Sequence, residues 1–312
     1  MFVCKTPALA AWAFGIFFLF STTAFSQSLL DELEAEADAS QEKEYAFATF
    51  KGVRVINGHS VEMPGKGELL FIIQHRFGRI NTGFSEMFGW DQASIRIGLE
   101  YTLPFSERFN LGFGRSSYGK TWDGFLKTKI LKQSKPGSPV TLTSVNAMTI
   151  NTMPWANPNQ ENFFSSRLAY VHQLLIARKF NSWFSLQLSP SLVHKNLVPD
   201  TRDQNTFFVM GFSGRAKISN RVAINAEYFW LVPGQEIPQI NNADPQGALS
   251  IGVDWETGGH VFQFQLTNAQ AMFDMGFMSE TIGRWDNGDI HFGFNITRTF
   301  SFSKKAKKAP KD

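Results

Sequence analysis

The sequence predicts an exported, all-β fold: a transmembrane antiparallel up-and-down β-barrel of about twelve strands in a Gram-negative outer membrane. Three observations predict it. Apolar and polar residues alternate repeatedly along the chain, the connections between these stretches are short and long in turn, and an apolar segment typical of a secretion signal stands at the N-terminus. A chain of 312 residues is long enough for one large barrel.

Residues 1–26 have the features of a cleaved secretory signal peptide. Lys5 provides a minimal positive region, residues 8–20 form an apolar run, and small residues follow at Ala24 and Ser26. The apolar run is too short to span a bilayer comfortably as an uncleaved anchor. Because the only cysteine, Cys4, precedes this run, the mature chain is expected to have no disulfide and no thiol chemistry.

Residues 27–66 are predicted to form a periplasmic lead-in. Its first part, residues 28–42, is strongly acidic and is expected to be a short helix or disordered. The following stretch, residues 45–64, contains Phe47, Phe50, Val53, Val55 and Ile56, which is too apolar for a solvated linker. We therefore expect it either to enter the periplasmic mouth of the barrel as a plug or to dock on its rim.

Alternation with a period of two residues predicts the barrel itself, over residues 67–302. Successive side chains of a strand face opposite sides, so alternation indicates a wall with one apolar and one polar face. Leu249, Ile251 and Val253, for example, oppose Ser250 and Asp254. The same pattern predicts strands of a length that suits a tilted bilayer crossing, at residues 67–77, 92–103, 108–117, 122–132, 139–151, 167–179, 183–195, 205–217, 221–232, 247–256, 260–268 and 289–302.

The connections distinguish a membrane barrel from a soluble β-sandwich. Short turns at residues 104–107, 180–182, 218–220 and 257–259 alternate with longer loops at 78–91, 152–166, 196–204, 233–246 and 269–288. Outer-membrane barrels have short periplasmic turns and long external loops. One pair breaks the pattern, because residues 118–121 are fewer than residues 133–138. An even strand number returns both termini to the periplasm, where residues 303–312 form a basic, solvated tail.

Seven sequence blocks resemble a family of uncharacterised outer-membrane β-barrel proteins of Bacteroidota, a domain-of-unknown-function family. The blocks are FKGVRVINGHSVE (50–62), HRFG (75–78), GRSSYGKTWDGFLK (114–127), QLLIARKF (173–180), LVPGQ (231–235), ETGGHVFQ (256–263) and GDIHFGFN (288–295). The resemblance covers nearly all of the mature chain. It implies an outer-membrane barrel, and it transfers no catalytic residue because the family has none assigned. Many barrels end on an aromatic residue, whereas ten residues follow Phe302 here.

If the apolar faces of the strands meet lipid, the opposite faces line a lumen. A water-filled pore and a lumen closed by salt bridges both fit the polar residues at those positions. Because acidic and basic residues are nearly balanced, a strongly ion-selective channel is disfavoured. The candidate lumen-lining residues are Arg76, Arg96, Glu100, Lys127, Lys129, Gln187, Arg215, Asn225, Glu227, Asp254 and Gln263.

The leading functional interpretation is a passive channel or binding pore for small polar solutes. The alternative is a non-conducting structural or docking barrel in an envelope complex, and a lipid-acting enzyme comes third. No catalytic residue, metal site or cofactor is predicted, because no G-x-S-x-G motif occurs and the six histidines lack metal-site spacing. The expected partners are outer-membrane lipid and small polar solutes. The net charge of +3 argues against nucleic acid, and protein partners are left open.

Overall fold

The computed structural model describes residues 43–155, 157–159, 161–200, 202–257 and 260–302. The predicted signal peptide, the whole acidic stretch at residues 28–42 and the basic tail lie outside these residues. The chain divides into two units, Met1–Glu44 and Tyr45–Asp312, and the barrel belongs to the second.

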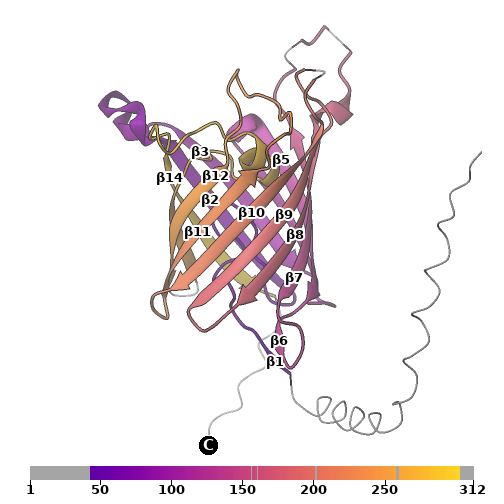
Figure 1. The fold of residues 1–312 in the computed structure, drawn as a ribbon, viewed down its shortest axis with the longest axis vertical. Helices are drawn as coiled ribbons and strands as arrows, with labels where there is room; N and C mark the ends of the chain where they lie inside the picture. Colours follow the sequence, from indigo (N-terminus) through magenta and orange to yellow (C-terminus); the bar gives the residue numbers. More distant parts are fainter. Residues whose placement is uncertain (1–42, 156, 160, 201, 258–259, 303–312) are drawn as a thin grey trace, which may run out of the picture. The chain divides into compact units, whose positions relative to one another are not determined.

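Twelve antiparallel strands of the described residues form one closed barrel (Figure 1). The ring closes where its first strand, β2, pairs with its last, β14. The strands tilt relative to the barrel axis, as closure of a sheet requires. Their bounds are β2 (Glu68–Arg79), β3 (Ala93–Thr102), β4 (Phe109–Ser116), β5 (Thr121–Leu131), β7 (Thr141–Asn151), β8 (Leu168–Lys179), β9 (Phe184–Lys195), β10 (Thr206–Lys217), β11 (Val222–Leu231), β12 (Ala248–Thr257), β13 (His260–Thr267) and β14 (His291–Ser301).

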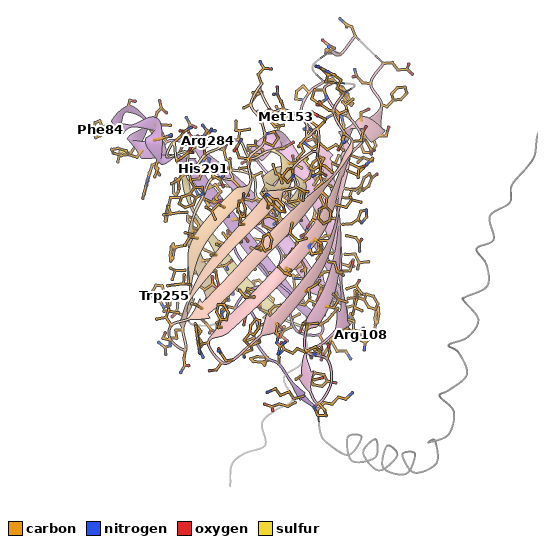
Figure 2. All side chains as sticks on the ribbon, viewed as in Figure 1. Phe84, Arg108, Met153, Trp255, Arg284 and His291 are labelled. Carbon is orange, nitrogen blue, oxygen red and sulfur yellow. The ribbon has the colours of Figure 1, made fainter. Side chains whose placement is uncertain are left out.

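The predicted fold class is confirmed, and each of the twelve predicted ranges corresponds to one strand with ends that agree within two residues. The agreement follows from the two faces of the wall. In β12, Ile251 is 48% exposed on the outside, whereas its neighbour Ser250 is fully buried on the inside. Trp255 lies on the outer face near one end of the barrel, where aromatic residues gather in membrane barrels (Figure 2).

The two ends of the barrel differ in their connections. At the short-turn end the strands are joined by residues 103–108, 132–140, 180–183 and 218–221. The long-loop end carries short helices, and among the described residues no helix is long and apolar enough to cross a membrane. These short helices are η1 (Ile80–Thr82), η2 (Phe84–Gly89), η3 (Tyr118–Lys120), η4 (Phe164–Arg167) and α2 (Asp274–Ser279).

The connection that broke the predicted alternation has a structural reason. Residues 132–140 contain a two-residue strand, β6 (Ser134–Lys135), which pairs with β1 (Glu44–Tyr45) outside the barrel wall. The backbone N–H of Ala46 donates to the carbonyl of Gln133 at 2.9 Å just beyond this pair. This turn is longer than the others because it binds the chain that leads toward β2.

The outward orientation of Ile251 gives a testable prediction about the wall. Ile251→Arg places a charge on the lipid-facing side near the middle of β12, which is expected to lower the free energy of unfolding by about 2–4 kcal/mol. Unfolding by guanidinium in lipid vesicles, followed by tryptophan fluorescence, measures it. Ile251→Leu is the matched control and should unfold like the original chain. Equal stability of the Arg and Leu variants would show that this side of β12 does not face lipid.

Candidate functional site

The segment that precedes β2 lies inside the barrel and does not dock on its rim. We call residues 46–64 the lumenal hairpin. Phe50 and every residue from Val53 to Val61 are buried. The chain turns back on itself there, because the N–H of Val55 donates to the carbonyl of Gly58 and that of Ser60 to Val53, at 2.8 and 2.9 Å. The hairpin enters from the short-turn end, where β2 begins, and this is the location that a plug requires.

One carboxylate holds the tip of the lumenal hairpin. Glu227, on the inner face of β11, accepts hydrogen bonds from three successive backbone N–H groups, those of Ile56, Asn57 and Gly58, at 3.2, 2.7 and 3.1 Å. Such a row of N–H groups forms a small anion-binding concavity. The fit is close, since a Cβ atom at Gly58 would stand 2.5 Å from the ring of Phe229. Any larger residue at this turn would force the buried Phe229 ring to move.

Side chains from most strands of the ring bind further polar groups of the hairpin. Donors from five strands reach its carbonyl oxygens: Lys127 Nζ to Glu62 at 2.6 Å, Gln187 Nε2 to His59 at 2.7 Å, Arg215 Nη1 to Ala48 at 3.0 Å, Gln263 Nε2 to Val55 at 3.1 Å and Asn295 Nδ2 to Ile56 at 3.0 Å. Two further strands bind the side chain of Asn57. It accepts from Arg76 Nη2 at 2.8 Å and donates to Ser250 at 2.9 Å. Buried backbone carbonyls need such partners, so the polar lumen is the counterpart of the hairpin.

The hairpin also brings charge into the barrel. Arg54 Nε lies 3.8 Å from Glu100, and its Nη1 lies 3.7 Å from Asp274. Elsewhere in the lumen Arg96 pairs with Asp123, Nε to Oδ1 at 2.9 Å. Buried ions are tolerated only when they are paired. Lys195 Nζ lies 3.5 Å from Glu280. Among the described residues the buried cations are Arg54, Arg76, Arg96, Lys127, Lys195 and Arg215, and the buried carboxylates are Glu100, Asp123, Glu227, Asp254 and Asp274.

Part of the connection between β13 and β14 also lies inside the lumen. We call residues 268–283 the inner loop. Helix α2 of this loop is buried throughout and lies within the long-loop mouth in Figure 1. Phe277 packs on Phe229 with ring centroids 4.8 Å apart, in one apolar cluster with inward residues such as Val171 and Val209. The prediction that residues 269–288 form an external loop is therefore wrong for this part, because the run AMFDMGFM is too apolar for solvent.

The hairpin and the inner loop meet inside the barrel. His59 Nε2 and Asp274 Oδ2 are 3.2 Å apart, and Gln173 Nε2 donates to the other oxygen of Asp274 at 2.9 Å.

Cavities are present at the two mouths of the barrel. One of about 580 Å³ lies at the short-turn end, lined by Glu62 and Lys129 among others, and one of about 770 Å³ lies among the long loops.

A second set of contacts fixes the residues that follow the inner loop to the rim. Asp289 accepts hydrogen bonds from Asn81 Nδ2 at 2.9 Å and from the backbone N–H of Arg284 at 3.1 Å, and it pairs with Arg79 at 3.1 Å. Partial burial alone would raise the pKa of Asp289, but these partners outweigh it and lower the pKa below the usual aspartate value. The carboxylate therefore stays charged at neutral pH. Figure 2 shows Arg284 and His291 together at this rim.

The structure places ten of the eleven candidate residues at buried inward positions, and Lys129 at the edge of the short-turn mouth. Seven of them, Arg76, Glu100, Lys127, Gln187, Arg215, Glu227 and Gln263, contact the lumenal hairpin directly. Their role as the lining of a pore remains a prediction. In the described part of the chain, no three His, Cys, Asp or Glu side chains form a group that could hold a metal ion.

The alternating pattern did not indicate the site residues of the two inner segments, above all Arg54, Asn57, His59 and Asp274. Each is a polar residue within a short apolar run, VRVINGHSV or AMFDMGFM, that lies outside the alternating strands. Such runs outside the wall are the signal that could have located them.

Comparison with protein families assigns the chain to a family of membrane barrels. A family model described as a membrane-bound beta barrel domain (DUF5777) matches residues 50–300. Among curated protein sequences, none matches the chain. The solved structure of the NanC porin is similar over 76% of this chain and 100% of its own, at 8% identity and a TM-score of 0.43. An outer membrane channel from Pseudomonas putida F1 is similar over 77% of this chain and 97% of its own, at 12% identity and a TM-score of 0.46.

The contacts of Glu227 predict how firmly the lumenal hairpin is held. Glu227→Ala leaves three buried N–H groups of the hairpin without their acceptor. The bound state of the hairpin is expected to lose about 3 kcal/mol, so the population of released hairpin should rise roughly 100-fold. With Cys4→Ser, a Ser60→Cys substitution supplies the only cysteine, and its labelling rate with a charged maleimide measures release. Glu256→Ala is the control, because that carboxylate pairs with Lys51 in a partly exposed position. Unchanged labelling in Glu227→Ala would show that the carboxylate does not hold the hairpin.

Proposed function

Because the chain belongs to the family of membrane-bound β-barrel domains that matches residues 50–300, we propose that it is a gated outer-membrane barrel. The lumen is closed at rest by the lumenal hairpin and the inner loop, and small polar solutes pass when the hairpin leaves. The short-turn end faces the periplasm, as in membrane barrels generally, so the hairpin withdraws to the periplasmic side. No enzymatic step is part of this proposal.

The observation that carries the proposal is the difference in chemistry between the two inner segments. The hairpin contributes Phe50, Val55, Ile56 and Val61 to the buried apolar cluster, but its backbone N–H and carbonyl groups are bound by inward polar side chains, among them Glu227, Lys127 and Gln263. Water can replace these partners once it enters the lumen, so the net free energy that opposes withdrawal is much smaller than the number of contacts suggests. The inner loop packs through Phe273, Phe277 and Met278, which water does not stabilise.

The inner wall supports a path for polar solutes on one side. Inward positions of β2, β3 and β5 carry Gln74, Arg96, Glu100, Asp123 and Lys127. Inward apolar positions concentrate on β8, with Ala169, Val171, Leu175 and Ala177, and on the first part of β10, with Phe207 and Val209, where they join the buried cluster of the inner loop. When the hairpin leaves, the polar side becomes the lining. Its mixed charges favour small polar or zwitterionic solutes over ions of one sign.

A permanently closed barrel that acts as a scaffold is the second candidate. The apolar packing of the inner loop favours it, since Phe229 and Phe277 form part of a buried cluster that resembles a protein core. The two candidates differ in one measurable property. A gated barrel conducts after the hairpin is removed, and a scaffold does not.

Conductance in planar bilayers tests the proposal. The chain beginning at residue 27 should show no steady open current, and neither should a control that lacks residues 27–43. Deletion of residues 46–64 should produce steady currents, and further replacement of residues 270–280 by a Gly-Ser linker should enlarge them. A change in gel mobility on boiling verifies in each case that the barrel is folded.

Three results would contradict this function. Steady current through the undeleted chain would show that the lumen is open at rest. Current that appears only when both segments are removed would assign the gate to the inner loop. Folded barrels that stay silent after both changes would establish the scaffold.

A further inference from the structure

The outer wall carries a hydrogen-bonded polar cluster where lipid is expected. Ser144 and Asn146 on β7 and His172 on β8, here called the outer polar cluster, point away from the lumen, because their neighbours Val145 and Val171 are fully buried on the inside. Asn146 and His172 are register partners across the two strands. Asn146 Oδ1 lies 2.8 Å from His172 Nδ1, and Asn146 Nδ2 donates to Ser144 Oγ at 3.2 Å.

The cluster lies at mid-depth in the wall. Asn146 is the central residue of β7 (Thr141–Asn151), so it is as far from both ends as that strand allows. Its outward neighbours include the apolar side chains Leu126, Met148, Leu174 and Leu192, with Tyr170 and Thr128 at the edges of the cluster. Outward arginines such as Arg178 and Arg298 lie instead near strand ends, where long side chains reach the interface. The outward ring of His75 is stacked on Phe294 with centroids 5.0 Å apart.

Lipid cannot satisfy the remaining hydrogen-bonding capacity of this cluster. Asn146 Oδ1 can only accept, so His172 donates from Nδ1 and keeps Nε2 as an acceptor. Asn146 retains a second amide hydrogen, and the Ser144 hydroxyl retains its own. Polar groups of this kind at the bilayer centre are costly and face protein partners in membrane proteins. We propose that the outer polar cluster is the contact between two copies of this chain in the membrane.

A second copy fits the chemistry of the cluster better than a different partner. The cluster is uncharged when His172 is neutral, and its free groups include both donors and acceptors, so it is complementary to itself. A two-fold axis along the membrane normal brings the same residues of the second copy against it, as isologous dimers require. No outward residue of β7 itself is aromatic. The register partners of outward Met148 are Gly124 on β5 and Tyr170 on β8.

Disulfide cross-linking in outer membranes tests the contact. In a Cys4→Ser background, Met148→Cys introduces the only cysteine at the edge of the cluster, at 41% exposure. Leu266→Cys is the matched control, also 41% exposed but on β13, six strands away from β7 in both directions around the ring. Mild oxidation should yield a band of twice the chain mass for Met148→Cys and not for Leu266→Cys.

A second substitution connects the cross-link to the polar groups themselves. Asn146→Leu with His172→Leu, added to Met148→Cys, should reduce the dimer band about tenfold. The barrel should still fold, because leucine suits a lipid-facing site, and gel mobility on boiling verifies it. The proposal is overturned if Met148→Cys gives no dimer, if it forms an adduct with another protein, if Leu266→Cys cross-links equally, or if the two leucines leave the dimer band unchanged.

Discussion

Hydrocarbon offers no hydrogen bonds to a polypeptide backbone, and the rest of this structure depends on that constraint. Twelve strands satisfy it only as a ring, so β2 must meet β14 and no strand edge is left. Closure turns one face of every strand inward, away from both lipid and bulk water. Inward groups such as Glu227 and Lys127 then need partners of their own, and the backbone of the lumenal hairpin supplies them. The closed wall and the hairpin inside it therefore both follow from the need to satisfy buried hydrogen-bonding groups.

The sequence predicted the wall well because the constraint acts on every second residue. An outward position must be apolar and its neighbour is free to be polar, which is why Ile251 and Ser250 could be assigned to opposite faces from alternation alone. Loop lengths carried information too. The irregular turn at residues 132–140 marks the place where β6 pairs with the incoming chain, although only the structure gives that reason.

The contents of the lumen were less accessible to sequence analysis, because irregular segments have no period to read. Apolar composition indicated that residues 45–64 are not solvated, yet it could not distinguish the rim from the interior. The inner loop was missed, since its place between two strands suggested an exposed connection. The role of inward apolar residues such as Val171 and Val209 was equally ambiguous. These residues pack in one cluster with the inner loop, which lies far from them in the sequence.

The position of the hairpin beside the closing seam has a consequence for the order of assembly. Asn295 of β14 donates to the carbonyl of Ile56, a bond between residues 239 apart in the sequence. β14 is the last strand to be synthesised and the one that completes the ring against β2. The earliest segment of the barrel unit thus acquires its final hydrogen bonds only when the latest strand arrives. A chain that ends before β14 therefore has both an open wall and an incompletely bound hairpin. Loss of this one strand during assembly causes both defects.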